Sequence, residues 1–263
     1  MTPAASSAVS KTALVTGAAK RIGRVIALEL AKRGWDVVVH YGQSEADARM
    51  LVQEIIQLGR HAAAIQCDLA DEATVKTLLA RAQTAISPDC APISCIVNNA
   101  SKFKQDSVAD FSSAALDAHM HPNLAAPILL AQALHAATPT GQQAVVINLL
   151  DQKLFNPNPD FFSYTLSKAA LHSATTMLAQ ALAPTVRVVG VAPGITLVSG
   201  DQSTEGFANA HKQTPLGRSS TPVDVAATVC FVAESPAITG TTIVVDGGQH
   251  LIPSPRDVMF IAT

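Results

Sequence analysis

Short apolar runs alternate with stretches of helical periodicity along nearly the whole chain of 263 residues. The runs at 12–16 and 36–40 are continuously apolar or β-branched, which is typical of strands buried on both faces of a parallel sheet. Between them, 22–33 has the 3.6-residue period of a helix. A second helix is predicted over 44–58, where Ser44 can serve as the N-cap.

Five further strand candidates continue this alternation. They lie at 61–67, 93–98, 144–149, 186–191 and 242–245. The connections are short turns rich in Gly, Pro and Asp, and no long polar linker marks a domain boundary. Right-handed β-α-β crossovers then predict an α/β protein with a doubly wound, seven-stranded parallel sheet and helices on both faces. We expect a flexible tail over 1–10, one domain over 11–263 and a ligand at the carboxyl ends of the strands.

The chain is poor in charge for its size. Charged residues make up 14% of it, against about 25% in an average globular domain, so we expect extensive burial between subunits. The net charge of −2 lacks the basic excess of a nucleic-acid-binding protein. No apolar run reaches the length of a membrane span, and the first eleven residues lack the pattern of a secretion signal. These features predict a soluble, cytoplasmic protein.

Cysteine and histidine spacing does not indicate a disulfide framework or a metal site. None of the four cysteines belongs to a C-x-x-C pair, so we expect all four to be small buried apolar residues. His119 and His121 are two residues apart, which places their rings on different faces of a helix. Packing or an interface is therefore the expected role of both, and no metal is predicted.

A glycine-containing turn follows the first predicted strand and leads directly into the first predicted helix. The turn is Thr16-Gly-Ala-Ala-Lys-Arg-Ile-Gly23. This is the context of a dinucleotide pyrophosphate site, in which glycine permits a tight turn and close approach of the phosphates. Arg21 stands where many such sites have their middle glycine, which puts a cation where phosphate would lie. An ordinary strand-to-helix turn is the alternative interpretation.

The end of the second predicted strand favours NADP over NAD. NAD sites usually have Asp or Glu about 20 residues past the glycines, to bind the ribose 2′-hydroxyl. Here the strand ends in His40-Tyr41-Gly-Gln-Ser44, without a carboxylate to repel a 2′-phosphate. Lys20, Arg21, His40 and Ser44 can all donate hydrogen bonds to such a phosphate.

Further motifs resemble those of the short-chain dehydrogenase/reductase family. In chain order they are Asp68, Asn98-Asn99-Ala100, Asn123, Tyr164-x-x-x-Lys168, Pro193-Gly194 and Asp246-Gly247-Gly248. The resemblance implies a single-domain Rossmann fold, NADP(H) as the cofactor, and a homotetramer in which the last strand and the tail 251–263 join an interface. The cofactor-binding residues are then Gly17, Lys20, Arg21, Ile22, Gly23, His40, Tyr41, Ser44, Asp68, Leu69, Asn99, Ala100, Ser101, Tyr164, Lys168, Pro193, Gly194 and Thr196.

Tyr164 and Lys168 are the expected catalytic pair. A Y-x-x-x-K match taken alone is more often a surface helix pair, but residues four apart do share one helix face. There a lysine ammonium can lower the pKa of a neighbouring phenol, so that Tyr164 donates a proton near neutral pH. The resemblance adds that Lys168 holds the nicotinamide ribose, and that Asn123 supports a water-linked proton path.

The fifth predicted strand ends in a departure from the usual family pattern. The family has a serine about thirteen residues before the tyrosine, whose hydroxyl helps to bind a substrate carbonyl, whereas this chain has Asp151. A carboxylate would repel the oxyanion that develops when a ketone is reduced. A heterocycle with ring nitrogens and amino donors suits the site better. With a pKa raised by burial, Asp151 could supply a proton through Tyr164 to a ring nitrogen.

This substitution resembles the pteridine reductase branch of the family, which includes short-chain-type dihydrofolate and dihydromonapterin reductases of bacteria. In that branch, Ser101 would contact cofactor and pterin, and Phe103 would sandwich the pterin against the nicotinamide. Core or lid packing is the alternative role for Phe103. The substrate-binding residues implied by the resemblance are Arg21, Ser101, Phe103, Asp151 and Tyr164.

The leading hypothesis is an NADPH-dependent pteridine reductase that transfers hydride to a C=N bond of a pterin, dihydropterin or dihydrofolate. Asp151, Tyr164 and Lys168 would deliver the proton, with Asn123 as the fourth catalytic residue. A carbonyl reductase of the 3-oxoacyl type and a non-catalytic NADP-binding regulator are the alternatives. The natural substrate is not predicted, because the loop 195–214 that would determine it has no decodable pattern.

Overall fold

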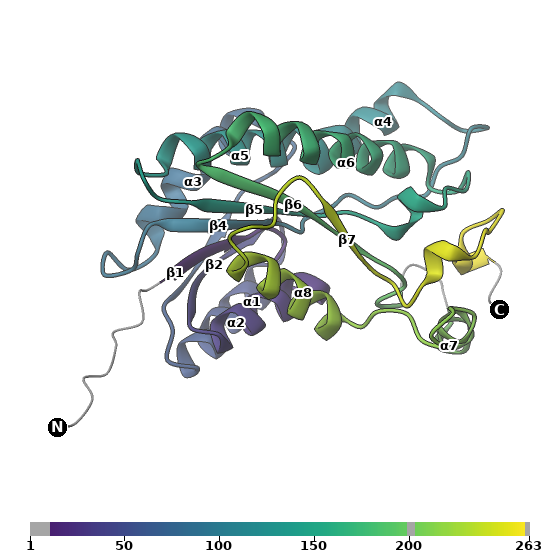
Figure 1. The fold of residues 1–263 in the computed structure, drawn as a ribbon, viewed down its shortest axis with the longest axis horizontal. Helices are drawn as coiled ribbons and strands as arrows, with labels where there is room; N and C mark the ends of the chain where they lie inside the picture. The colour runs from purple at the N-terminus through teal and green to yellow at the C-terminus, as the bar shows by residue number, and fades with distance from the viewer. Residues whose placement is uncertain (1–10, 199–202, 261–263) are drawn as a thin grey trace.

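A parallel sheet of seven strands forms the centre of the molecule (Figure 1). The computed structural model describes residues 11–198 and 203–260. The strand order is β3-β2-β1-β4-β5-β6-β7. In chain order the strands are β1 (Lys11–Val15), β2 (Trp35–Tyr41), β3 (Ala62–Gln66), β4 (Ile93–Asn98), β5 (Ala144–Leu149), β6 (Val186–Pro193) and β7 (Thr242–Val245). The predicted fold class is confirmed, and β4, β5 and β7 have the predicted ends.

Helices cover both faces of the sheet (Figure 1). On one face lie α1 (Arg21–Lys32), α2 (Glu45–Gln57) and α8 (Pro222–Glu234), and on the other lie α3 (Glu72–Ala85), α5 (Ala126–Ala137) and α6 (Phe162–Leu182). The shorter elements are α4 (Ser113–Met120), α7 (Thr204–Lys212), a π-helical turn η1 (His121–Ala125) and the 3-10 turns η2 (Gln152–Phe155), η3 (Gln249–Leu251) and η4 (Val258–Phe260). Ser44 stands at the N-cap of α2, as predicted, but its side chain makes no capping bond.

Two apolar clusters hold these layers together, one on each side of the sheet. The first joins α1, α2 and α8 to the strands through residues such as Ile26, Leu51 and Val229. The second does the same for α3 and α5 through Leu78 and Leu130. Because the central strands are buried on both faces, their sequences are largely apolar rather than alternating. All four cysteines are buried and have free thiols, as expected.

The strand order places the site. The chain leaves β1 towards β2 on one side, and β4 lies on the other side of β1. This reversal opens a crevice at the carboxyl ends of the strands, where doubly wound folds bind their ligands. The loops after β1, β4, β5 and β6 all reach this edge.

Two further observations concern membranes and metals. None of the described helices is long and apolar enough to cross a membrane. Within 11–198 and 203–260, no three His, Cys, Asp or Glu side chains are grouped so that they could hold a metal ion. His119 is buried and bonded to the Ala115 carbonyl and the Lys104 N–H, whereas His121 is exposed. The two rings thus lie in different environments.

Candidate active site

A cavity of about 710 Å³ lies at the carboxyl ends of the strands. Its walls include many of the residues that the sequence predicts for the site, namely Gly17, Lys20, Arg21, Ile22, Gly23, Asn99, Ala100, Ser101, Phe103, Asp151, Tyr164, Pro193, Gly194 and Thr196. Other predicted residues are not part of its lining, namely His40, Tyr41, Ser44, Asp68, Leu69, Asn123 and Lys168. Asn156 and Asn158, from the segment before α6, also form part of the wall.

The glycine turn between β1 and α1 is packed tightly against the loop after β4. Gly17 has a φ of +60°, a left-handed conformation that glycine adopts without strain. A Cβ at Gly23 would lie 2.4 Å from the Gly17 carbonyl oxygen and 2.5 Å from Nδ2 of Asn99. The Asn99 amide donates to the Thr16 carbonyl at 2.9 Å, which ties the two loops together. This turn therefore needs glycine at both positions.

Arg21 has a positive φ of 55° at the first position of α1. Left-handed backbone costs a residue with a Cβ about 1–2 kcal/mol, so glycine would be the less strained choice here. The guanidinium lines the cavity and donates to the Val198 carbonyl at 3.1 Å. The turn keeps its shape and places a cation beside the helix N-terminus, where an anion is favoured.

His40 does not have the role predicted from the sequence. Its ring is buried, its Nδ1 accepts the Gly17 N–H at 3.0 Å, and its Nε2 donates to the Cys67 carbonyl at 3.1 Å. Burial lowers its pKa to about 4, so the ring is neutral at physiological pH. Both nitrogens are used within the protein, and the hypothesis that His40 donates to a 2′-phosphate is corrected. Instead, His40 supports the glycine turn.

The residues after β2 carry no carboxylate before α2 begins. Lys20 lies beside this segment and forms an ion pair with Asp47 of α2 at 3.0 Å. Ser44 is partly exposed at the start of α2, and Tyr41 lines a separate shallow hollow. The surroundings of a bound 2′-phosphate would then be Arg21, Ser44 and a lysine already shared with Asp47.

The site is centred on a direct contact between a carboxyl group and a phenol. The hydroxyl of Tyr164, in the first turn of α6, donates to Oδ2 of Asp151 at 2.8 Å. The other oxygen, Oδ1, accepts the Lys153 backbone N–H at 2.9 Å. Burial raises the pKa of Asp151 above its usual value. Burial and the neighbouring Asp151 also raise the pKa of Tyr164 well above its usual value.

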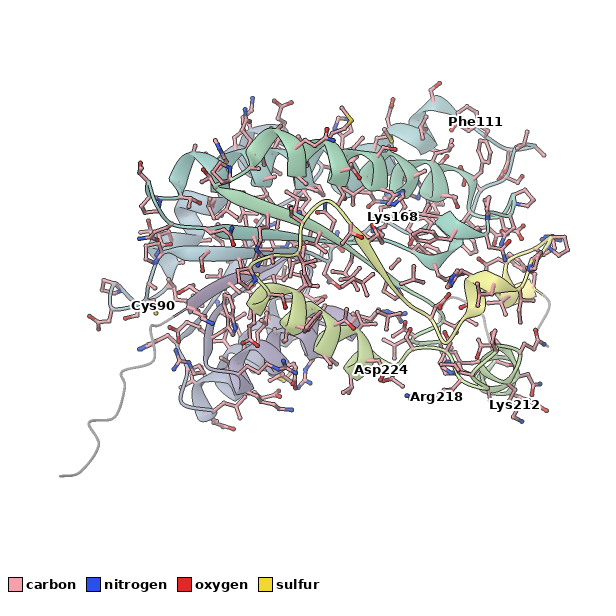
Figure 2. All side chains as sticks on the ribbon, in the orientation of Figure 1. Cys90, Phe111, Lys168, Lys212, Arg218 and Asp224 are labelled. Carbon is pink, nitrogen blue, oxygen red and sulfur yellow. The ribbon has the colours of Figure 1, made fainter. Side chains whose placement is uncertain are left out.

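Lys168 differs from the sequence expectation. Its ammonium donates to the Leu149 carbonyl at 2.7 Å and lies 5.8 Å from the centre of the Tyr164 ring. Figure 2 shows it on the side of α6 that faces the sheet. Burial lowers the pKa of Lys168 itself to about 8. Burial and Asp151 raise the net pKa of Tyr164, so any lowering by Lys168 does not dominate in this arrangement.

Asn123 fastens the loop that carries Phe103. Its amide exchanges two hydrogen bonds with the Lys102 backbone, at 2.7 and 3.0 Å, and donates to Ser167 Oγ at 2.9 Å. Asn123 lies in the π-helical turn between α4 and α5. The Asn123 side chain thus positions this loop against α6, and the water-linked proton path stays a prediction.

Phe103 forms an aromatic shelf at the edge of the cavity. Its ring stacks on Phe161 with centroids 4.3 Å apart and meets Tyr164 edge-on at 4.7 Å. It remains 45% exposed, so one face is accessible from the cavity. The position is compatible with stacking on a flat heterocycle.

The segment 252–260, hereafter the C-terminal strap, forms a wall of the cavity that no sequence pattern predicts. Six of its residues line the cavity, namely Ile252, Ser254, Arg256, Asp257, Val258 and Met259. Asn156 donates to the Ile252 carbonyl and so joins the strap to the segment before α6. That the tail 251–263 joins an intersubunit contact stays a prediction, and residues 261–263 lie outside the described part of the chain. The strap also contacts the segment before α6 through a hydrogen bond from Arg256 to Asp160, two residues that are 96 positions apart. A local sequence pattern cannot reveal a contact over this separation.

Comparisons with known proteins agree with this geometry. The family model described as enoyl-(acyl carrier protein) reductase matches residues 17–250. A 3-oxoacyl-[acyl-carrier-protein] reductase of Staphylococcus aureus is 32% identical over an alignment of length 254, which covers 92% of this chain and 99% of that protein.

Solved structures extend the comparison. The FolM alternative dihydrofolate reductase 1 of Brucella suis, in complex with NADP, is 39% identical with a TM-score of 0.88, covering 94% of this chain and 98% of that chain. The corresponding protein of Brucella canis, also complexed with NADP, is 39% identical with a TM-score of 0.85, covering 92% and 95%. The glycine turn, the Tyr164 and Lys168 pair and these similarities together show that the chain belongs to the short-chain dehydrogenase/reductase family of NADP-dependent oxidoreductases.

Proposed function

We propose that the protein is an NADPH-dependent pteridine reductase that reduces a C=N bond of a pterin, dihydropterin or dihydrofolate. The contact of Tyr164 Oη with Asp151 Oδ2 at 2.8 Å is the observation that carries this proposal. Two similar structures with the same overall fold are named alternative dihydrofolate reductases. The name supports the substrate class, and the carboxyl group supplies the chemical reason.

The residues present fit the nicotinamide cofactor. Gly17 and Gly23 leave room at the N-terminus of α1, and Arg21 adds a cation beside it. The absence of a carboxylate between β2 and α2 favours the 2′-phosphate of NADPH over the ribose hydroxyl of NADH. When bound, NADPH would supply the hydride. The protein's own residues would supply the orientation and the proton.

Asp151 and Tyr164 can hold and move that proton. Because burial raises the pKa of Asp151, its carboxyl group can keep a proton closer to neutral pH than an exposed aspartate does. The protonated carboxyl can donate to Tyr164 Oη, and the phenol in turn to a substrate nitrogen. Ionised Asp151 would instead face the oxyanion formed from a ketone and raise its energy.

Phe103 would bind the flat ring of the substrate. The hydrogen bonds of Asn123 to the Lys102 backbone hold the loop in which Phe103 lies beside Tyr164. A pterin stacked on the Phe103 ring would therefore lie next to the proton donor. The Ser101 hydroxyl donates to Oδ1 of Asn123 at 3.3 Å, and Ser101 lines the same cavity. The positions of both residues support the substrate-binding roles that we propose for them.

A 3-oxoacyl carbonyl reductase is the second candidate, because a curated relative at 32% identity has that name. A non-catalytic NADP-binding regulator is the third, and the presence of Asn123, Tyr164 and Lys168 together argues against it.

The test is NADPH oxidation, followed at 340 nm, with dihydropterins and dihydrofolate beside 3-oxoacyl thioesters and simple ketones. Preference for the pterins supports the proposal, preference for ketones contradicts it, and cofactor binding without turnover favours the regulator.

We further propose that residues 11–263 act as one catalytic domain and that the active form is a homotetramer. Exposed apolar side chains on α6 and α8, such as Met177 and Phe231, support an interface on both faces of the molecule. This proposal concerns assembly and does not affect the assignment of the reaction.

A further inference from the structure

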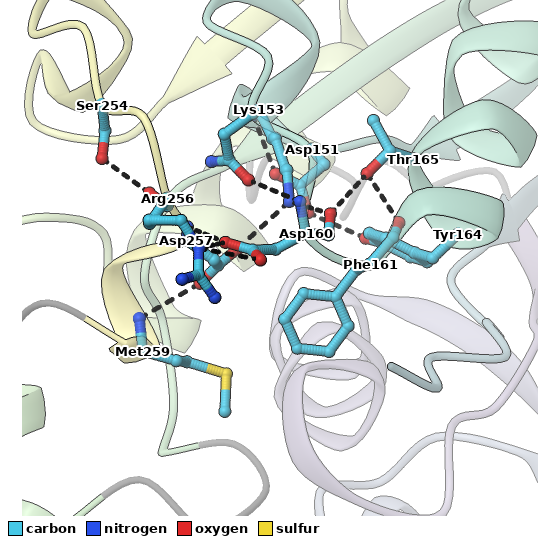
Figure 3. Close-up of polar contacts among 11 residues, drawn as sticks. Asp151, Lys153, Asp160, Phe161, Tyr164, Thr165, Ser254, Arg256, Asp257 and Met259 are labelled. Carbon is cyan, nitrogen blue, oxygen red and sulfur yellow. Dashed lines mark hydrogen bonds and ion pairs between the residues drawn. The ribbon is translucent and has the colours of Figure 1, made fainter. Parts of the chain in front are cut away.

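Besides the Asn156 contact, the carboxylate of Asp160 binds the C-terminal strap to the segment before α6 (Figure 3). Nε of Arg256 donates to both oxygens of Asp160, at 3.0 and 2.9 Å, and the Asp257 N–H donates to the same carboxylate at 2.6 Å. Charged donors hold the pKa of Asp160 below its usual value despite partial burial. The strap is thus anchored to the chain segment that leads into Tyr164.

Lys153 connects this anchor to the catalytic carboxyl group. Its side chain is buried, and its ammonium donates to the Asp160 carbonyl at 2.5 Å and lies 3.4 Å from Oδ2 of Asp257. Its own backbone N–H donates to Oδ1 of Asp151. The Lys153 side chain therefore contacts Asp257 of the strap, and the Lys153 backbone binds the Asp151 carboxyl group, as Figure 3 shows.

Charges of both signs surround Asp151. From α6 come the Tyr164 hydroxyl and the Lys168 ammonium, from η2 comes Lys153, and from the strap comes Asp257. The negative charge of Asp257 acts to raise the pKa of Asp151, and the positive charge of Lys153 acts to lower it. Asp160 and Arg256 form an ion pair with each other at 2.9 Å, so they add one charge of each sign to this cluster.

We propose that Lys153 and Asp257 are a pair of positioning residues for Asp151, through which the C-terminal strap becomes part of the proton-delivery apparatus. Lys153 orients the carboxyl group towards Tyr164. Asp257 keeps the ammonium of Lys153 in place and sets the electrostatic balance at the carboxyl group. The inference rests on the proposed function only where turnover is used as its readout.

The two charges have opposite effects on the acidity of Asp151, and this gives a test that a purely structural role would not satisfy. If protonated Asp151 is the required form, the rate falls as pH rises through its pKa. Lys153→Met should move this falling limb of the kcat profile to higher pH, and Asp257→Asn should move it to lower pH. We expect each shift to be about half a pH unit or more. Lys153→Arg should restore the wild-type limb, and the double variant should lie between the single ones.

The pKa can also be measured without turnover, which separates this inference from the proposed function. Protein labelled with ¹³C at aspartate carboxyl carbons is titrated by NMR, with Asp151→Asn identifying the resonance. Lys76→Met, which removes an exposed lysine of α3, is the matched control. If wild-type protein does not reduce pterins, the proposed function fails and the titration still decides the inference.

Opposite shifts in the two variants, with no shift in the control, support the proposal. Equal shifts in one direction, or no shift in variants whose Tm matches the wild type, would overturn it. Should Lys153→Met fail to fold, Asp257→Asn and Lys153→Arg carry the test. In that case an unchanged Asp151 resonance in Asp257→Asn is the contradicting result.

Discussion

The Gly17 N–H donates to Nδ1 of His40 at 3.0 Å. The imidazole ring of His40, in β2, therefore stabilises the glycine turn that follows β1. This bond requires Nδ1 to be unprotonated, and the other nitrogen already faces the Cys67 carbonyl. A second proton on the ring would therefore break the contact that shapes the cofactor turn.

Stability should consequently depend on pH through His40. Its pKa is about 4 in the folded protein, below the usual value of 6.5. Between these pH values the unfolded chain binds more protons at His40 than the folded protein does. The contribution of His40 to the free energy of unfolding is therefore complete above pH 6.5 and is lost as pH falls towards 4. The loss should reach about 3 kcal/mol at most. Denaturant titrations at pH 7 and pH 4.5 would measure it.

A variant pair isolates this residue. His40→Leu should be less stable at pH 7 and should show a weaker decrease towards pH 4.5, because it has no ring to protonate. Replacement of the exposed His135 by Gln should change neither the free energy of unfolding at pH 7 nor its decrease towards pH 4.5. An equally steep decrease in His40→Leu would show that other groups are responsible.

Asp151 and Tyr164 should act as one unit in turnover. Asp151→Ala removes the acid and should lower kcat with a dihydropterin by a factor on the order of 10² to 10⁴. Asp151→Asn keeps the shape without the proton and should lose most of that rate too. Tyr164→Phe should be comparable, and the double variant little worse than either single one. Steady-state kinetics would check these values, with an unchanged Kd for NADPH as the control; wild-type rates in Asp151→Ala would contradict the mechanism.

Arg21 should strengthen the binding of NADPH and lower the stability of the folded protein, because its backbone is left-handed. We expect NADPH to bind at least about tenfold more tightly than NADH, a difference of about 1.4 kcal/mol. Both Arg21→Ala and Arg21→Gly should narrow this gap in calorimetry. The glycine variant should be more stable than the alanine variant by about 1 kcal/mol, because only glycine relieves the left-handed φ of 55°. Equal Kd values for the two cofactors in the wild type would rule out the selectivity.

Asp106 should stabilise the catalytic helix from outside it. Its carboxylate accepts the Ser163 N–H at 2.9 Å, and its carbonyl accepts the Phe162 N–H at 3.1 Å. Asp106→Ala should lower the free energy of unfolding by about 1–2 kcal/mol, as the loss of a helix cap does. It should also raise KM for the pterin, since Phe103 is on the same loop. Asp106→Asn, which retains an acceptor oxygen, should keep most of the stability; an unchanged melting curve for the alanine variant would refute the capping role.

The homotetramer is tested by light scattering at micromolar concentration. Exposed apolar side chains on α8, among them Val223 and Phe231, would then be covered. Phe231→Glu should dissociate the assembly into smaller species while the fold, followed by circular dichroism, stays intact. A monomeric mass for the wild type would reject this proposal.

The sequence by itself was sufficient for the fold and for the part of the cavity wall that the glycine turn and the strand ends form. Apolar and β-branched runs mark strands of a parallel sheet, and the ends of β4, β5 and β7 agree with the sequence prediction. Glycine turns and strand ends are local features of the chain, and the doubly wound order brings them to one edge. Gly17, Ser101, Asp151 and Tyr164 line one cavity for this reason.

The tertiary structure decided what each polar side chain actually contacts. His40 was expected to face a phosphate, but its burial against Gly17 and Cys67 makes it a neutral support. Lys168 donates a hydrogen bond to the Leu149 carbonyl, and the pKa of Tyr164 is raised by burial and by Asp151. Burial and charge arise from the packing of distant segments, so no local spacing could reveal these effects. The C-terminal strap reaches the site through Asp160, 96 residues before Arg256, and only the folded chain brings these two together.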